Sequence, residues 1–324
     1  MTTRFRGAGA VSRAVAIQDD GKIVVAGGAD DGRRFAVARY LPNGTLDGTF
    51  GKEGKVTARF SAGGNFARAV AIAKDGTILV AGQTSHDNGS WFAVLRLLSD
   101  GSRDSSFGHD GRVTTQFGGV AGDAYGVAIQ GNGRIVVVGE GLSDGGFCLA
   151  RYRSDGRLDR GFGDAGTVVS RSPGGARAVA LQDDGRIVVG GIGGDIFGPF
   201  ALERYESDGH RDPTFSGNGR LTVSMGDGEE SGQAVMIQED GKIVEVGYTN
   251  VPHEFGDTGN GGFALVRVRP GGALDRSFGV DGKLVTEFSE GVSLGLAGAL
   301  QPNGKIVAAG WDAGNFGLAR YLAA

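Results

Sequence analysis

Short apolar runs that end in glycine recur along the whole chain, separated by polar turns. The clearest is an eight-residue segment that begins with an Asp-Gly or Asn-Gly turn and continues as an apolar strand. It occurs six times: DGKIVVAG (20–27), DGTILVAG (75–82), NGRIVVVG (132–139), DGRIVVGG (184–191), DGKIVEVG (240–247) and NGKIVAAG (303–310). The glycines at its second position are 55, 57, 52, 56 and 63 residues apart, which indicates six repeats of one structural unit.

Each repeat contains four strand-like segments. In the first repeat these are AVAIQ (14–18), KIVVAG (22–27), FAVARY (35–40) and KVTARF (55–60). Four short antiparallel strands in a repeat of this length form one blade of a β-propeller. We therefore expect an all-β fold, a six-bladed β-propeller with four antiparallel strands per blade, in a single domain that spans residues 1–324.

The two ends of the chain complement each other. The sixth repeat stops at FGLARYLAA (316–324) after three strands, whereas the chain opens with MTTRF, which resembles fourth-strand segments such as RVTTQF (112–117). We expect the N-terminal strand, residues 2–5, to complete the last blade and close the ring, because closure protects strand edges from aggregation. A linear β-solenoid is the alternative; it would need polar caps and would leave this complementarity unexplained.

The repeat resembles the delta-60 repeat family. The resemblance rests on IVVAG, then FAVARY, then NGTLDGTFG, and it covers essentially the whole chain. It implies a propeller-type repeat of the kind common in bacterial surface and secreted proteins. It does not imply one chemistry, because a fold of this kind can carry many functions.

Composition and charge exclude several classes of protein. Glycine accounts for 63 of the 324 residues but proline for only 7, which is not the composition of a disordered Pro/Gly-rich tract. The net charge is −4 and Lys and Arg are scattered, so we expect no nucleic-acid partner. No run approaches the roughly 20 apolar residues of a membrane span, and the single cysteine, Cys148, excludes an internal disulfide.

The compartment and the assembly state are less constrained. Disulfide-poor chains lean towards the cell interior, and we find no signal peptide in the chain. A cytoplasmic protein and a secreted protein whose leader is missing from this chain both fit these observations. We expect a monomer.

Residues that recur at one position in every repeat are expected to hold the blades together. An arginine recurs in the third strand, at positions 39, 96, 151, 204, 267 and 320. An aspartate and a phenylalanine recur in the connection that follows, at positions 47, 104, 159, 212 and 275 and at 50, 107, 162, 215 and 278. We predict an Arg–Asp pair that braces the outer corner of each blade, and a core position for each phenylalanine.

Function is expected where the repeats differ. The turns between first and second strands and the LDxxFG connections are nearly uniform. The loops between second and third strands, and those that lead from one repeat to the next, vary in length and content. Since function concentrates on loops carried by a rigid frame, we expect the variable loops and the channel mouth beside them to form the working face.

Two sets of positions on the inner strands are candidates for ligand binding. The first set begins the innermost strand: Arg13, Arg68, Tyr125, Arg177, Gln233 and Leu296. Its three arginines would favour an anion, or alternatively would bridge neighbouring blades or coat the channel mouth with charge. The second set follows the glycine that ends each eight-residue segment, which we call the octet glycine. Its members are Gly28, Gln83, Glu140, Ile192, Tyr248 and Trp311. Its Glu, Tyr and Trp resemble the rim of a pocket, so Glu140, Tyr248 and Trp311 join the polar residues of the first set as candidate ligand-binding residues.

Two carboxylates interrupt apolar strand positions in adjacent repeats. Glu203 stands at a position where the other repeats have alanine, leucine or valine. Glu245 stands at a different strand position, where the other repeats have valine or alanine. An ionised carboxylate between blades is costly unless it is paired. The two residues are therefore candidates for an acid–base pair with a raised pKa. The alternatives are a buried Glu–Arg pair at each site, or a carboxylate that reaches solvent.

The longest insertion adds a third candidate catalytic residue, His253, with Glu254 and Asp257 beside it. These three residues could assist catalysis or bind a metal. No HxxxH, HExxH or paired His/Cys spacing supports a metal site, so we predict none. The loop 250–262 has the Asp and Gly content of a calcium site without the EF-hand order, and calcium binding there stays open. The chain has no GxSxG motif and no phosphate-binding loop, and we expect no cofactor.

Two functions remain open. The first is a binding module that presents its variable-loop face and channel mouth to a small polar or anionic molecule, a glycan or a protein. The second is a hydrolase, lyase or cyclase acting on a small molecule at the mouth of the central channel. They differ in whether the candidate residues converge around one cavity, as an enzyme requires.

Overall fold

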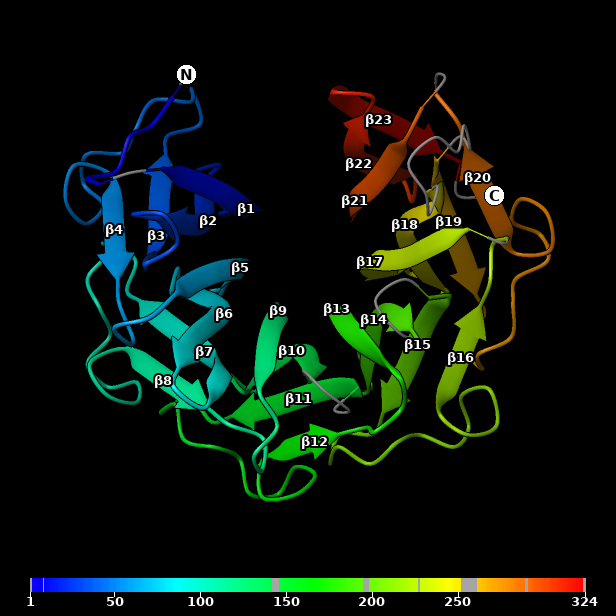
Figure 1. Ribbon diagram of the computed structural model, residues 1–324, viewed down its shortest axis with the longest axis horizontal. Helices are drawn as coiled ribbons and strands as arrows, with labels where there is room; N and C mark the ends of the chain where they lie inside the picture. The colour runs from blue at the N-terminus through cyan, green and yellow to red at the C-terminus, as the bar shows by residue number, and fades with distance from the viewer. Residues whose placement is uncertain are drawn as a thin grey trace. The chain divides into compact units, whose positions relative to one another are not determined.

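The computed structural model describes residues 2–7, 9–141, 146–194, 198–226, 228–251, 261–288 and 291–322. These residues belong to two compact units, 1–171 and 172–324. All regular secondary structure among the described residues is β-strand (Figure 1). None of the described residues belongs to a helix that is long and apolar enough to cross a membrane.

Unit 1 contains the first three repeats, and each repeat forms one four-stranded antiparallel sheet. Blade 1 consists of β1 (Ala10–Ile17), β2 (Ile23–Ala29), β3 (Arg34–Tyr40) and β4 (Lys55–Ala58). Blade 2 consists of β5 (Asn65–Ile72), β6 (Ile78–His86), β7 (Gly89–Leu97) and β8 (Arg112–Thr115). Blade 3 consists of β9 (Gly122–Ile129), β10 (Ile135–Gly141), β11 (Gly146–Tyr152) and β12 (Thr167–Val169).

Unit 2 contains the other three repeats. Blade 4 consists of β13 (Gly174–Leu181), β14 (Ile187–Gly193), β15 (Phe200–Tyr205) and β16 (Arg220–Val223). Blade 5 consists of β17 (Glu229–Ile237), β18 (Ile243–Val251), β19 (Gly262–Val268) and β20 (Lys283–Thr286). Blade 6 has three strands in the described chain: β21 (Ser293–Leu300), β22 (Ile306–Asp312) and β23 (Asn315–Tyr321). The predicted six blades are therefore present, and their placement in a single domain stays a prediction.

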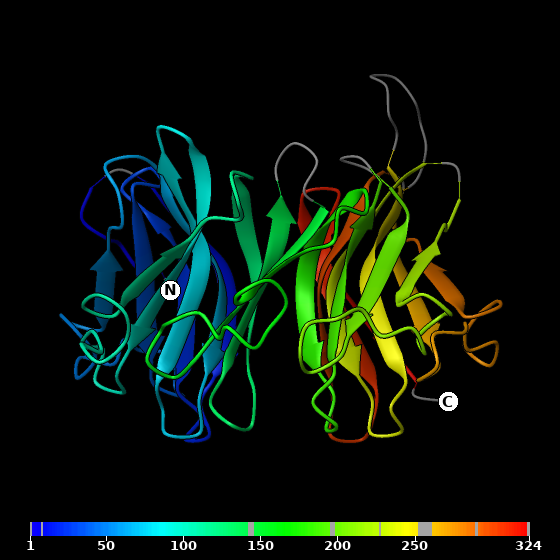
Figure 2. The same cartoon turned by 90° about the horizontal axis from the view of Figure 1, so that it is seen from below.

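The loops of each unit lie at two opposite ends of its blades (Figure 2). The turns between first and second strands are tight, and in blade 1 the Gly21 amide donates a hydrogen bond to the Gln18 carbonyl at 2.8 Å. Gly21 has φ +79°, which is the left-handed conformation that an Asp-Gly turn requires. The loops between second and third strands are less uniform. In blade 1 this loop is a turn in which the Arg33 amide donates to the Asp30 carbonyl at 3.1 Å.

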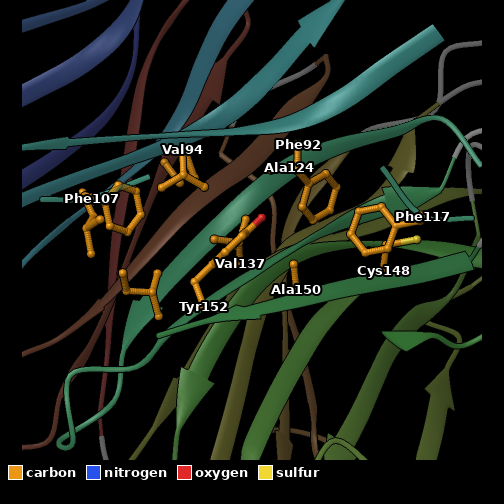
Figure 3. Packing of buried hydrophobic residues seen from close by; sticks show 13 residues of the cluster. Phe92, Val94, Phe107, Phe117, Ala124, Val137, Cys148, Ala150 and Tyr152 are labelled. Carbon is orange, nitrogen blue, oxygen red and sulfur yellow. The ribbon is translucent and has the colours of Figure 1, made fainter. Parts of the chain in front are cut away.

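The hydrophobic core lies between neighbouring blades. Between blades 2 and 3, Phe92 and Phe107 belong to the same cluster as Cys148 and Tyr152 (Figure 3). Burial, with a smaller contribution from the charge of Glu140, raises the pKa of the Cys148 thiol to about 12, so this cysteine is a protonated core residue. The five phenylalanines predicted to be core residues are all buried: Phe50, Phe107, Phe162, Phe215 and Phe278.

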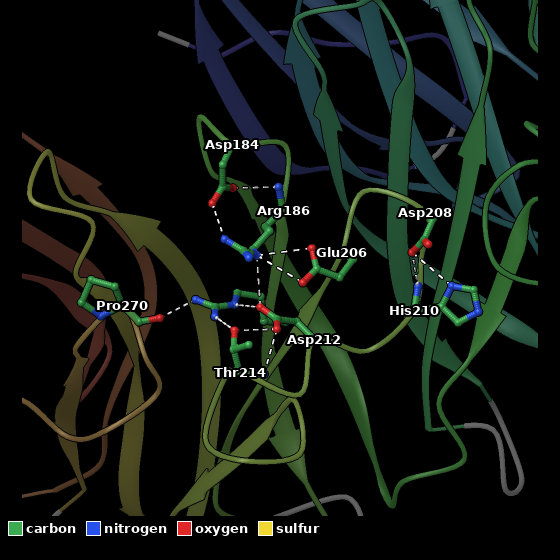
Figure 4. A network of polar contacts seen from close by, with 9 residues as sticks. Asp184, Arg186, Glu206, Asp208, His210, Asp212, Thr214 and Pro270 are labelled. Atoms are coloured by element: carbon green, nitrogen blue, oxygen red, sulfur yellow. Dashed lines mark hydrogen bonds and ion pairs between the residues drawn. The ribbon is translucent and has the colours of Figure 1, made fainter.

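The repeated arginine and aspartate form an ion pair in five blades, as predicted. The pairs are Arg39–Asp47, Arg96–Asp104, Arg151–Asp159, Arg204–Asp212 and Arg267–Asp275. In blade 4, Arg204 Nε lies 2.7 Å from Asp212 Oδ2. Figure 4 shows Asp212 in a network of polar contacts with Arg186 and Thr214. The Arg204 guanidinium also lies 4.9 Å from the Phe215 ring centre and donates a hydrogen bond to the carbonyl of Pro270 in blade 5. The pair therefore connects neighbouring blades as well as bracing its own.

Residues 2–5 are not part of a strand in the structure. The hydroxyl of Tyr40 in β3 donates a hydrogen bond to Thr3 Oγ1 at 2.7 Å. The same bond joins Tyr321 in β23 to Thr286 in β20 at 2.9 Å, where the threonine lies on the fourth strand of the preceding blade. Thr3 therefore takes, towards blade 1, the role of a fourth-strand threonine. Closure of the ring by residues 2–5 stays a prediction.

Candidate functional site

Each innermost strand contains a β-bulge at the first set of candidate positions. In β1, the pairing with β2 shifts between Ser12 and Ala14, so Arg13 is the extra residue. The corresponding shift in the other blades leaves one residue without a partner in the ladder: Arg68, Tyr125, Arg177, Gln233 and Leu296. A bulge changes the direction of a side chain, and bulges are frequent beside active sites.

The glycine that ends each octet is required by this bulge. A Cβ atom at Gly82 would lie 1.9 Å from the carbonyl oxygen of Phe66, two residues before the bulged Arg68. At the other five octet glycines, a Cβ atom would lie 1.8 to 2.1 Å from the equivalent carbonyl oxygen. The carbonyl group of the bulged strand therefore occupies the space that any side chain would need.

In blades 2 and 3 the bulge residue binds the residue that follows this glycine. Arg68 donates two hydrogen bonds to Gln83 Oε1, from Nε at 3.0 Å and from Nη2 at 2.6 Å. The Tyr125 hydroxyl donates to Glu140 Oε1 at 2.8 Å. The Arg68 guanidinium also lies 4.5 Å from the Tyr125 ring centre, and Arg68 Nη2 lies 3.5 Å from Asp123 Oδ2. Arg68 therefore bridges blades 2 and 3, which was the structural alternative to anion binding.

Blade 1 lacks the partner that Arg68 has in blade 2. Gly28 occupies the position of Gln83, so Arg13 has no acceptor from its own blade. The Arg13 side chain is exposed and makes no hydrogen bond or ion pair with the described residues. Arg13 is thus the arginine of the first set whose charge is available to a ligand in unit 1.

A cavity of about 250 Å³ lies beside Arg13, between blades 1 and 2. The strands β1 and β5 lie side by side there (Figure 1). The cavity is lined by Gly9, Val11, Arg13, Gly28, Asp31, Gly32, Phe66, Ala67, Arg68 and Gln83. Its loop residues come from the loop before β1 and the loop between β2 and β3. Both belong to the loop classes that vary among the repeats.

Asp31 and Phe66 are among the residues of the cavity wall that were not predicted from the sequence. Asp31 lies in the turn between β2 and β3 and has φ 49°, an uncommon conformation for a residue other than glycine. Phe66 is 41% exposed, and its ring lies so close to Gly32 that a Cβ there would be 2.0 Å away. A signal was available for Phe66, because other repeats have Val11, Asp123, Gly175, Ser231 or Leu294 at this position.

The remaining candidate ligand-binding residues lie in unit 2, and none of them lines this cavity. Gln233 donates a hydrogen bond from Nε2 to Ser231 Oγ at 2.6 Å. Arg177 and Tyr248 are half-buried, and Trp311 is 41% exposed. Their roles in ligand binding stay predictions.

Glu203 forms the Glu–Arg pair that the sequence left as one alternative. Its side chain is completely buried, and its Oε1 lies 2.7 Å from Arg220 Nη1 and 3.3 Å from Arg211 Nη2. The hydroxyl of Tyr205 donates a hydrogen bond to its other oxygen. These donors satisfy the carboxylate, as a buried charge requires.

Glu245 is also buried, but its surroundings are different. Neither of its carboxyl oxygens accepts a hydrogen bond of normal geometry from the described residues. Burial raises the pKa of Glu245 well above its ordinary value of 4.5, although the nearby Gly191 amide opposes this rise. Space for the carboxyl group comes from Gly190 and Gly232, where a Cβ would lie 2.8 Å and 2.0 Å from Glu245 Oε1.

The two carboxyl groups do not converge. Glu203 pairs with Val189 of β14, so both side chains lie on one face of the blade 4 sheet. Glu245 packs on Gly190, the next residue of β14, which points to the opposite face. The structure therefore does not bring Glu203 and Glu245 together as an acid–base pair, because the blade 4 sheet lies between them.

Glu245 makes the stability of the protein depend on pH. Well below pH 4.5 the carboxyl group is neutral in both the folded and the unfolded state, so its ionisation does not change the free energy of unfolding there. As the pH rises above 4.5, the unfolded chain ionises first, and stability falls by about 1.4 kcal/mol per pH unit until the folded-state pKa is reached. Glu245→Gln should remove this slope, which urea unfolding of both proteins from pH 4 to 9 would measure. Parallel stability curves for the two proteins would contradict the assignment.

The third catalytic candidate, His253, and its neighbours Glu254 and Asp257 lie outside the described residues, as does most of the loop considered for calcium. Within the described part of the chain, no group of three or more His, Cys, Asp or Glu side chains could hold a metal ion.

Solved structures of known proteins share the fold at low sequence identity. A protein from Lactobacillus plantarum is 14% identical, with a TM-score of 0.55 over 95% of this chain and 80% of that chain. A catalytically inactive virginiamycin B lyase from Staphylococcus aureus with quinupristin is 11% identical, with a TM-score of 0.54 over 97% and 85%. A glucose dehydrogenase is 13% identical, with a TM-score of 0.55 over 97% and 96%. Likeness at this level shows the fold alone. No curated protein sequence matches the chain.

The family comparison matches all six repeats. The matched segments are residues 18–50, 73–107, 130–162, 182–215, 238–278 and 301–323, which together make up more than half of the chain. The predicted fold class, a six-bladed β-propeller, is thereby confirmed. The match also supports the predicted β-propeller repeat family, but it does not confirm the delta-60 name. The chain belongs to the family described as Domain of unknown function (DUF5122) beta-propeller.

Proposed function

We propose that the protein binds a small polar or anionic molecule in the cavity between blades 1 and 2. The observation that carries this proposal is Arg13, a cation that has no partner among the residues the structure describes, since Gly28 stands where blade 2 has Gln83. Arginine recognises carboxylate and phosphate groups by two parallel hydrogen bonds. The volume of about 250 Å³ lies below the roughly 300–1,000 Å³ of pockets for drug-sized ligands, which favours a small metabolite.

The enzyme alternative has less support from this cavity. Its described lining contains one carboxylate, Asp31, and no His, Cys, Ser, Thr or Tyr side chain. Glu203 is held by two arginines, and Glu245 is 1% exposed and does not line the cavity. Catalysis would need groups within hydrogen-bond reach of one substrate position. The delta-60 resemblance adds to the binding proposal the expectation of a bacterial surface or secreted protein.

Substitution of Arg13 and Gly28 tests the proposal. Arg13→Gln removes the cation, and Gly28→Gln supplies the acceptor that Gln83 gives to Arg68. A Cβ at Gly28 would meet only ordinary contacts, 3.5 Å or more, so this variant should fold. Each variant should weaken binding about 10-fold or more, since a hydrogen bond to a charged group contributes about 1.5–3 kcal/mol.

The measurement is calorimetric titration with acetate, succinate and inorganic phosphate. The control is Arg33→Gln, which removes the same charge from an exposed side chain that does not line the cavity. The proposal predicts that the control binds as tightly as the wild type, and that Arg13→Gln and Gly28→Gln bind about 10-fold or more weakly. Equal affinity in Arg13→Gln and wild type, or no binding of any probe, would overturn it.

A further inference from the structure

We propose that the ligand of this cavity is a small zwitterion, an α-amino acid with an apolar side chain. This inference rests on the proposed function and names its ligand class. It combines three side chains of the cavity wall: Arg13, Asp31 and Phe66. Each would recognise one part of the ligand.

The cavity wall carries both a positive and a negative side chain, Arg13 and Asp31. Asp31 is exposed, lines the cavity and makes no hydrogen bond or ion pair with the described residues. Its neighbour Asp30 differs, because Asp30 Oδ2 lies 3.6 Å from Arg34 Nε. Arg13 and Asp31 thus carry opposite charges in one cavity without pairing with each other. A ligand with both charges would satisfy both groups.

A simple anion is not the ligand that this wall fits best. Arg68 also lines the cavity, but Asp123 at 3.5 Å offsets its charge and Gln83 uses two of its hydrogen-bond donors. The cations and carboxylates at the wall are therefore nearly balanced. Asp31 would repel an anion that Arg13 attracts. An ammonium group on the same molecule would turn this repulsion into an attraction.

Apolar side chains form another part of the cavity wall. Phe66 is 41% exposed, and Val11 beside it is 58% exposed, so the wall offers apolar surface to the cavity. The ring of Phe66 rests on Gly28 and Gly32, whose missing side chains permit its approach. Ala67 adds another apolar group to the same wall. An apolar side chain of the ligand would bury this surface.

The test compares four probes by calorimetry on the full chain: L-phenylalanine, N-acetyl-L-phenylalanine, L-phenylalaninamide and acetate. The acetylated probe lacks the ammonium group, and the amide lacks the carboxylate. Phenylalanine should bind at least 10-fold more tightly than either derivative. Asp31→Asn should weaken the binding of phenylalanine about 10-fold, and its affinity for N-acetyl-L-phenylalanine should be unchanged or higher. Arg13→Gln should weaken the binding of phenylalanine without affecting the binding of the amide.

Asp30→Asn is the matched control, because it makes the same change one residue away, at a carboxylate that does not line the cavity. Asparagine tolerates the left-handed conformation of both positions, so both variants should fold. N-acetyl-L-phenylalanine binding as tightly as phenylalanine, or an unchanged affinity in Asp31→Asn, would overturn the zwitterion proposal while anion binding stands. No binding of any carboxylate probe would overturn the zwitterion proposal and the proposed function together.

Discussion

Replacing Asp212 by alanine is expected to reduce the free energy of unfolding by about 3–5 kcal/mol, because the buried Arg204 would lose its carboxylate partner. Arg204 Nε lies 2.7 Å from Asp212 Oδ2, and both side chains are almost completely buried. The Thr214 hydroxyl, which donates to Asp212 Oδ1 at 2.6 Å, would lose its acceptor as well. Urea unfolding at pH 7 would measure the loss.

The same carboxylate predicts a pH dependence. Burial alone would raise the pKa of Asp212, but hydrogen bonds from Thr214 and Arg204 outweigh it and lower the pKa from 3.8 to about 2. A depressed pKa contributes stability that is present above about pH 4 and is lost as the pH falls through about 2. The contribution is about 2 kcal/mol. The difference between wild type and Asp212→Ala should therefore narrow below pH 4.

Asp208 provides the control, since it lies in the same connection (Figure 4) but its side chain is 57% exposed and pairs with the exposed His210. Asp208→Ala should cost less than about 1 kcal/mol. If Asp212→Ala lost no more stability than Asp208→Ala, the Arg–Asp pair would not be the brace between blades that the structure indicates.

Replacing Gly82 by alanine is expected to cost about 3 kcal/mol, the upper end of the usual range for overpacking. The added methyl group would lie 1.9 Å from the Phe66 carbonyl oxygen, a backbone atom that cannot move without disturbing the bulge. The bulge directs Arg68 towards Gln83, so the variant should also displace Arg68. Urea unfolding would measure the first effect, and a crystal structure of the variant the second.

Gly48→Ala is the matched control, because a Cβ there would meet no atom within 4 Å and Gly48 does not have a positive φ. Alanine at position 48 should leave stability unchanged or raise it slightly. A loss at Gly82→Ala no larger than at Gly48→Ala would show that the octet glycine is not required by the bulge.

The blades could be predicted from the sequence because their signals are local and repeated six times. The Asp-Gly turn, the apolar octet and the Arg–Asp pair each depend on residues that are close together in one repeat. The octet glycine was visible as a repeat, but its reason was not, because it meets a carbonyl group of another strand. That contact exists only after β5 has bulged against β6.

The candidate site could be predicted only in part. Arg13 and Gly28 were both in the compared sets, but the sequence does not show that one lies beside the other. Glu203 and Glu245 could be seen in the sequence as exceptions to the apolar residues of the other repeats. Their different surroundings in the structure depend on strand register and on which face of a sheet each side chain occupies. Glu203 meets Arg220 across β15 and β16, whereas Glu245 fills space left by Gly190 and Gly232.

Asp31 could not be predicted as a site residue, and Phe66, although it differs from its counterparts in the other repeats, could not be placed beside a cavity from the sequence. Asp31 reaches the cavity through a turn with uncommon backbone angles, and Phe66 reaches it by packing on glycines of another blade. Both effects depend on tertiary structure. The general lesson of this chain is that a missing side chain, Gly28, can mark a site as clearly as an added one.

The most direct test of the account is a crystal structure of the wild-type protein soaked with L-phenylalanine, with Gly28→Gln soaked in parallel. The account predicts electron density between Arg13 and Asp31 in the wild type, with the ligand carboxylate on the Arg13 guanidinium. It predicts an empty cavity in Gly28→Gln, with Arg13 turned to the new glutamine. An empty wild-type cavity, or a ligand bound equally in both proteins, would contradict the claim that an unpaired Arg13 makes this cavity the binding site.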